Sequence, residues 1–214
     1  GGALLAMKLL ITITAWTSTY VFLIMFRRLY PDSTLRGFLR EAFAERPNIR
    51  LLATTTSIQV AIFATCVCMV SIRSGIGPLA LLDLSPATLI STAFFVLIQG
   101  PMGEEIGWRG YLLPAIKDRV GLVKGALVVS LIWSFWHAPI WFLGTGYRGE
   151  ELCRYIIVFV VSVTSVGFVI GLCYHHNRNL VVAIWIHFIF NFLGEVFTGT
   201  KVDLVTWYAA FYPF

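Results

Sequence analysis

The stretch GPMGEEIGWRGY, residues 100–111, decides how this chain folds, because it places three charges inside a strongly apolar sequence. Ionisable side chains at membrane depth are costly and indicate a functional site. On a helix, Glu105 and Arg109 face each other as an i,i+4 pair, whereas Glu104 lies about 100° further round. We therefore expect Glu105 to pair with Arg109 and Glu104 to stay free for chemistry. A purely structural ion pair would leave Glu104 unexplained.

The composition is that of a membrane protein. The chain has 214 residues, of which 58% are hydrophobic and 13% charged, against roughly a quarter charged in soluble domains. Several apolar runs approach or exceed the ~20 residues that span a bilayer. We predict an all-α, polytopic transmembrane bundle of about six to eight helices. It forms one integral-membrane domain, residues 1–214, in the cell membrane.

The order of apolar and basic segments predicts the topology. Spans are expected at residues 9–26, 51–72, 122–143, 152–173 and 180–197, with a short surface helix near 35–43 and an apolar tail at 204–214. Basic residues gather in the connections at 27–50, 117–124 and 174–179, which the positive-inside rule assigns to the cytoplasm. The net charge of +5 therefore reflects topology and does not indicate nucleic acid. His175 and His176 are expected to be solvated in the last of these connections.

The segment around the acidic motif is an interrupted helix. Residues 87–117 are too many for one straight span, and Pro101 removes a backbone hydrogen bond directly after Gly100. We predict a helix over 87–99, begun by Ser85 as N-cap and Pro86 as first residue. A second helical piece then carries Glu104.

Polar residues on three predicted helices fall at similar depth. At a rise of about 1.5 Å per residue, Glu104, His137 and Asn191 lie ~20, ~21 and ~17 Å from the inner ends of their helices, and His187 lies ~11 Å from its own. His187 and Asn191 project together as an i,i+4 pair. His137 or His187 alone would be interpreted as a structural histidine, but the joint placement of these residues predicts a shared site.

These residue types suit hydrolysis. A glutamate or a neutral histidine can take a proton from water, and histidine and asparagine can donate hydrogen bonds to an oxyanion. The sequence has neither a serine nucleophile on a glycine elbow nor an H-E-x-x-H zinc motif. Two histidines and two carboxylates could still bind zinc, but the cation of Arg109 disfavours it. We expect water activation without a metal or other cofactor, with zinc as the alternative.

Three motifs match a known family. Glu104-Glu105-x-x-x-Arg109 resembles EExxxR, Trp133-x-x-x-His137 resembles FxxxH, and His187-x-x-x-Asn191 resembles HxxxN. In this order they resemble the CPBP family of intramembrane proteases, also called the Abi or type II CAAX prenyl endopeptidase family, over about residues 87–197. Trp133 replaces the usual phenylalanine, a departure that bears on packing or cavity shape.

The resemblance implies a role for each matched residue. Glu104 would activate the attacking water with help from His137, and Glu105 and Arg109 would support the site. His187 and Asn191 would form the oxyanion hole. The implied function is an intramembrane endopeptidase of the CAAX-processing or bacteriocin-processing type. Its partners would be the bilayer and a peptide or protein substrate, lipidated or not. A non-catalytic peptide-binding or immunity protein and a zinc-dependent intramembrane hydrolase remain alternatives.

Overall fold

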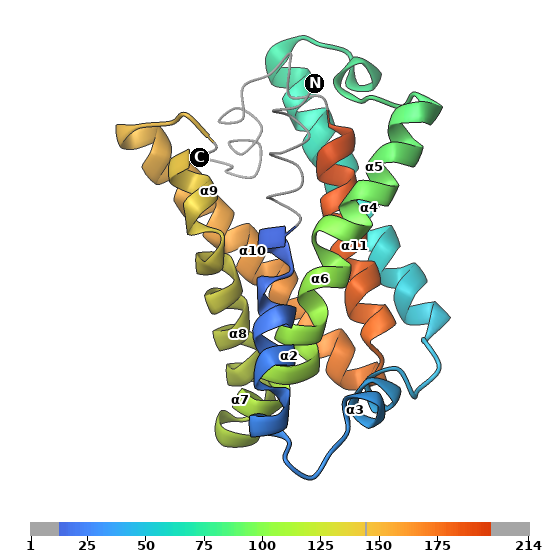
Figure 1. The fold of residues 1–214 in the computed structure, drawn as a ribbon. Helices are drawn as coiled ribbons and strands as arrows, with labels where there is room; N and C mark the ends of the chain where they lie inside the picture. Colours follow the sequence, from blue (N-terminus) through green and yellow to red (C-terminus); the bar gives the residue numbers. More distant parts are fainter. Residues whose placement is uncertain (1–12, 144, 198–214) are drawn as a thin grey trace.

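The computed structural model describes residues 13–143 and 145–197 (Figure 1). The regular elements in these two ranges are helices, and one isolated antiparallel bridge joins Leu82 to Phe197. The predicted all-α class is therefore confirmed. Four helical stretches are long and apolar enough to cross a membrane: Ile49–Ser74, Pro86–Val120, Leu122–Phe142 and Gly149–Asn177. Leu180–Val196 is a shorter apolar helix.

The helices form one bundle. In chain order they are α2 (Thr17–Leu29), α3 (Leu35–Ala42), α4 (Ile49–Ser74), the 3-10 turn η1 (Pro78–Leu81), α5 (Pro86–Gln99), α6 (Pro101–Glu105), the π-helical η2 (Ile106–Leu112), α7 (Leu113–Val120), α8 (Leu122–Trp136), α9 (Ala138–Leu143), α10 (Gly149–Asn177) and α11 (Leu180–Val196). α8 packs along α10, and α11 lies against α4, α5 and α10. α2 covers α6 and η2 (Figure 1).

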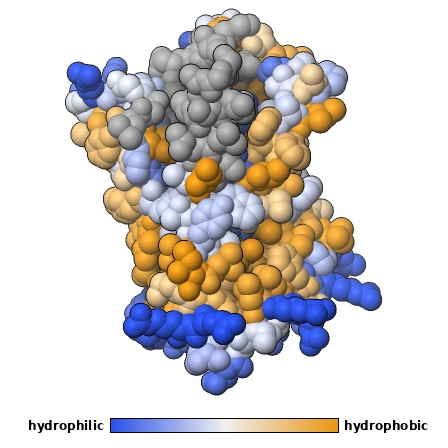
Figure 2. Space-filling model, viewed as in Figure 1, coloured by the Kyte–Doolittle hydropathy of each residue, from blue (hydrophilic) through white to orange (hydrophobic). Residues whose placement is uncertain are grey.

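Several expected segments agree with these bounds. The surface helix appears as α3, and the spans expected at residues 51–72 and 180–197 appear as α4 and α11. The span expected at residues 9–26 begins before the first described residue. The apolar tail expected at residues 204–214 lies outside the described residues. Figure 2 shows apolar surface over the middle of the molecule and hydrophilic side chains at the end where α2 leads into α3. The basic connections thus gather at one end, as predicted.

The connection predicted at residues 174–179 is wrong in its length. α10 continues to Asn177, so His175 and His176 lie in its last helical turn rather than in a loop. Arg178 then reverses the chain with φ 51°. The side chain of Asn179 caps the next helix by accepting a hydrogen bond from the Val181 amide at 2.7 Å. Two residues therefore suffice where a longer loop was expected.

The span expected at residues 122–143 is present as the helical stretch Leu122–Phe142, but a break that was not predicted interrupts it. α8 ends at Trp136 and α9 starts at Ala138, with His137 at the break. Pro139 has no amide hydrogen to donate to the carbonyl four residues earlier, and it disfavours helical geometry in the residue before it. The amide of His137 accordingly bonds to the Ser134 carbonyl at 3.2 Å, one residue closer than in an α-helix.

The start of α5 follows the prediction. The Ser85 side chain accepts a hydrogen bond from the Thr88 amide, and Pro86 is the first helical residue. Asp83 lies just before this cap and accepts hydrogen bonds from the Ser85 amide and the Thr88 hydroxyl, each at 3.0 Å. These donors, the Ser85 amide first, hold the pKa of Asp83 below its usual value.

The predicted break at Gly100 and Pro101 is confirmed. Gly100 leaves helical geometry, with φ −123° and ψ −80°, and its carbonyl accepts the amides of Gly103 and Glu104, both at 2.9 Å, to start α6. The indole of Trp16 donates to the Ile98 carbonyl at 2.8 Å, which satisfies one acceptor near the break. The two glutamates therefore begin a fresh helix inside the bundle.

Small residues let α2 approach this broken helix closely. A Cβ added at Gly103 would lie 2.4 Å from the Trp16 ring, and one at Gly107 would lie 2.7 Å from the backbone of Ser18. Packing through small residues is common between membrane helices, because it lets backbones approach each other. Gly107 meets backbone rather than a flexible side chain, so it cannot be enlarged without moving α2.

We expect Gly107→Ala to destabilise the protein by about 1–3 kcal/mol, because overpacking forces the two helices apart. The measurement is thermal or denaturant unfolding of the purified protein in detergent. Gly77→Ala is the matched control, since a Cβ there meets no atom of the described residues within 4 Å. Equal stability of the two variants would contradict the close contact between α2 and η2.

Candidate functional site

A buried ion pair forms the base of the site. Arg109 Nη1 donates to Glu105 Oε1 at 2.9 Å, and both side chains are 1% exposed or less. The predicted i,i+4 pairing is therefore confirmed. The same oxygen lies 2.7 Å from His187 Nδ1, a contact that the sequence did not predict. Glu105 thus joins the first motif to the third.

Arg109 makes two further contacts, one with the backbone of α10 and one with an aromatic ring. Its Nη2 donates to the Gly167 carbonyl on α10 at 3.3 Å. Its guanidinium carbon lies 4.5 Å from the centre of the Trp133 ring, within the range of a cation–π contact. Arg109 lies in η2, and π-helical turns occur frequently at functional sites. Nothing in the sequence pattern indicated this turn.

Glu104 has different surroundings from its neighbour. It is 3% exposed, and its Oε2 accepts a hydrogen bond from the indole nitrogen of Trp133 at 2.5 Å. The sequence interpretation gave Trp133 a role in packing or cavity shape, so this polar contact is a functional feature that it missed. A tryptophan at a position where phenylalanine is usual was the available signal, because only the indole can donate a hydrogen bond.

Three polar atoms converge beside Gly100. A Cβ added at Gly100 would lie 3.1 Å from Asn191 Nδ2 and 3.5 Å from both Glu104 Oε1 and His187 Nε2. We call the space bounded by Gly100 and these three side chains the Gly100 site. The structure therefore brings the first and third motifs together, as their predicted depths required.

His137 adjoins this group through Trp133. Its Nδ1 lies 2.8 Å from the Trp133 carbonyl, which can only accept, so Nδ1 carries the proton and Nε2 of the neutral ring is free to accept. Its ring centre lies 5.6 Å from that of Trp133. None of the three atoms nearest to the Gly100 site belongs to His137. The structure thus places His137 next to Trp133, and Trp133 in turn contacts Glu104.

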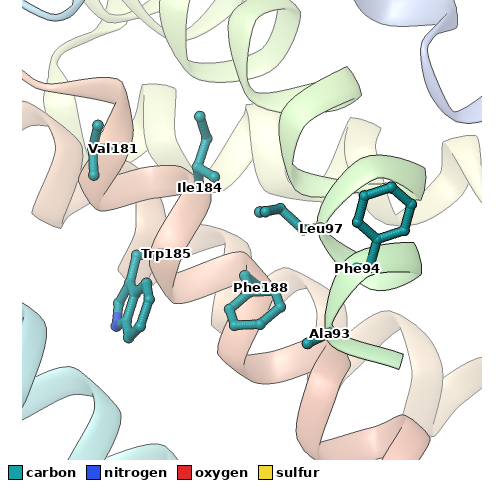
Figure 3. A pocket seen from close by; sticks show the side chains of 7 residues that line it. All are labelled: Ala93, Phe94, Leu97, Val181, Ile184, Trp185 and Phe188. Atoms are coloured by element: carbon teal, nitrogen blue, oxygen red, sulfur yellow. The ribbon is translucent and has the colours of Figure 1, made fainter. Parts of the chain in front are cut away.

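An apolar groove of about 340 Å³ lies between α5 and α11 (Figure 3). Its lining comes from Ala93, Phe94 and Leu97 on α5 and from Val181, Ile184, Trp185 and Phe188 on α11. Leu97 lies three residues before Gly100 and Phe188 directly follows His187. The groove therefore lies between α11, which carries His187 and Asn191, and α5, which ends at the residue before Gly100.

The donor set bears on metal binding. In the described parts of the chain, no group of three or more His, Cys, Asp or Glu side chains is placed to hold a metal ion. Glu105 Oε1 is already bound by Arg109 and His187. The groups that remain at the Gly100 site are one carboxylate oxygen, one imidazole nitrogen and one amide. This set fits hydrogen bonding to water or an oxyanion better than a zinc site with three or four protein ligands.

Fold and site together define a polytopic α-helical membrane protein with a buried cluster of ionisable side chains. The family model of Rce1-like type II CAAX prenyl endopeptidases matches residues 86–193, about half of the chain. The chain belongs to this family, which confirms the resemblance of the three motifs. The matched region begins at the N-terminus of α5 and includes all six predicted site residues.

A curated relative supports this assignment. The chain is 28% identical over 165 residues to CAAX prenyl protease 2 of Methanococcus maripaludis. The alignment covers 72% of this chain and 61% of the relative. The chain therefore spans less than two thirds of that protein's length.

We expect Arg109→Leu to lower the free energy of unfolding by about 3–5 kcal/mol, because it leaves the buried carboxylate of Glu105 without its cation. The measurement is unfolding in detergent, compared with the wild type. Arg154→Leu is the matched control, since Arg154 and Glu150 form the same i,i+4 pair in exposed positions, where such pairs contribute little. Similar losses from both variants would contradict a special role for the buried pair.

Proposed function

We propose that the chain is an intramembrane endopeptidase of the CAAX-processing or bacteriocin-processing type. The observation that carries this proposal is the Gly100 site, where one oxygen of Glu104 lies beside nitrogens of His187 and Asn191. A base and two hydrogen-bond donors around one small space are the groups that hydrolysis of an amide requires. Membership of a family of endopeptidases supports the same conclusion.

In the proposed reaction, Glu104 takes a proton from a water molecule. The water oxygen forms a bond to the carbonyl carbon of the substrate, and the carbonyl oxygen becomes an oxyanion. Collapse of this intermediate breaks the C–N bond, and the proton passes to the departing amine. His137, whose Nε2 is free in the neutral ring, helps to hold the water or carry its proton.

His187 and Asn191 are proposed as the oxyanion hole. Because His187 Nδ1 faces a carboxylate oxygen and donates to it, Nε2 can donate to an oxyanion only when the imidazole carries both protons. Asn191 Nδ2 supplies the second donor without any change of protonation.

We propose that the reaction needs no metal. Arg109 and His187 occupy Oε1 of Glu105, and the cation of Arg109 beside this carboxylate disfavours a second cation there. The alternative, a zinc-dependent hydrolase, predicts stoichiometric zinc in the purified protein and loss of activity on chelation. Either result would favour zinc over metal-free water activation.

The proposed substrate is a peptide or protein that reaches the site from the bilayer of the cell membrane. The groove between α5 and α11 has an entirely apolar lining, which suits an apolar segment or a lipid group attached to the substrate. The relative named CAAX prenyl protease 2 favours testing prenylated peptides together with unmodified ones. The second candidate, a peptide-binding or immunity protein, would use the same groove without cleavage.

Mass spectrometry of products from a peptide library, with prenylated and unmodified members, tests the proposal. We expect the wild type to give defined fragments and Glu104→Gln to lower kcat by about 10²–10⁴-fold, the usual contribution of a positioned base. The glutamine keeps the size of the side chain but cannot take the proton. His137→Ala should also reduce cleavage.

Unchanged cleavage by Glu104→Gln would end the claim that this residue activates water. Binding or protection without cleavage that survives both substitutions would favour the non-catalytic candidate. Glu150→Gln is a suitable control, because Glu150 is exposed at the start of α10. Thermal unfolding of each variant in detergent shows whether the folded protein was assayed.

A further inference from the structure

Trp133 contacts all three motifs of the site. It is 2% exposed, and its indole donates to Glu104 of the first motif. Its ring centre lies 4.9 Å from that of His187 in the third motif, in an edge-to-face arrangement. Its carbonyl binds His137 of its own motif. No function proposed above depends on the indole nitrogen.

The orientation of the indole is itself fixed. A Cβ added at Gly167 would lie 2.9 Å from Trp133 Cε3, so only glycine at this position of α10 leaves room for the ring. Arg109 lies over the ring and binds the Gly167 carbonyl. Steric contact and the cation together hold the ring in one place, which is the condition for an N–H group that orients a partner.

Glu104 needs such a partner. The other carboxylate, Glu105, is held by Arg109 and His187, while the hydrogen-bond donor that the structure gives the Glu104 carboxylate is Trp133. The two oxygens of a carboxylate exchange places when the group rotates. With Oε2 held by the indole, Oε1 stays at the Gly100 site.

We propose that Trp133 is a positioning residue whose indole N–H holds the Glu104 carboxylate with its free oxygen directed at the Gly100 site. This inference rests on the proposed role of Glu104 as the base. Trp133 acts through Glu104 and does not itself touch the reacting atoms. Trp133 thereby gives the second motif a hydrogen-bond donor that a phenylalanine could not supply.

The first test is Trp133→Phe, which keeps an aromatic ring and removes the N–H group. We expect kcat to fall about tenfold to a hundredfold with KM unchanged, since a hydrogen bond to a charged group is lost while substrate binding is retained. Trp141→Phe is the matched control, because it removes a buried indole N–H that has no hydrogen-bond partner among residues 13–143 and 145–197. A wild-type kcat in Trp133→Phe would overturn the proposal.

A variant of unchanged size covers the case in which Trp133→Phe does not fold. Replacement of Trp133 by 3-benzothienylalanine puts sulfur in place of N–H and keeps the bicyclic ring. A fall in kcat without a change in the unfolding temperature supports the proposal. Full activity with this analogue overturns it.

The second test does not depend on activity. In a proton–nitrogen NMR spectrum of the indole groups, the Trp133 resonance is identified by its absence in Trp133→Phe. We expect this resonance downfield in the wild type and shifted upfield in Glu104→Gln, where the acceptor is uncharged. An unmoved resonance would overturn the inference, even if the chain is a protease. An upfield shift in a chain that cleaves no peptide would support the contact and refute only the proposed function.

Discussion

One carboxylate oxygen, Oε1 of Glu105, accepts hydrogen bonds from Arg109 and His187 deep inside an apolar bundle. All three side chains are at most 2% exposed, and a buried charge without its partner costs several kcal/mol. Because Glu105 and Arg109 belong to the α6–η2 segment and His187 to α11, satisfying these charges fixes the two segments against each other. The shared oxygen therefore sets the position of the third motif relative to the first.

The two adjacent glutamates have different surroundings, which is the basis of the different roles proposed for them. Glu105 is neutralised by a cation on its own segment, whereas Glu104 meets an indole donor on α8. A pair of titratable groups in contrasting environments is the usual arrangement by which one fold separates a supporting charge from a working base. Gly100 ends α5 and precedes α6, the short helix that carries both glutamates. Because Gly100 has no side chain, the space beside Oε1 of Glu104 stays open.

The sequence predicted those features that depend on local chemistry. The helix class, the cap at Ser85, the break at Gly100 and the pairing of Glu105 with Arg109 follow from hydropathy, proline geometry and i,i+4 spacing, and the structure agrees. The break at His137, the π-helical turn and the polar contact of Trp133 were not predicted. The contact of Trp133 with Glu104 joins α8 to α6, which spacing along one helix does not reveal. The break at His137 has a local cause, because Pro139 follows two residues later.

The central claim is that a bond is cleaved in the space beside Gly100, and Gly100→Ala tests it most directly. The added methyl group would lie 3.1 Å from Asn191 Nδ2 and 3.5 Å from Glu104 Oε1 and His187 Nε2, where the water and the oxyanion must fit. The measurement is the cleavage rate of a peptide substrate by this variant. We expect a loss of at least about 100-fold, because reacting groups are then misplaced, in a protein that unfolds at the wild-type temperature. Cleavage at the wild-type rate would contradict catalysis at the Gly100 site.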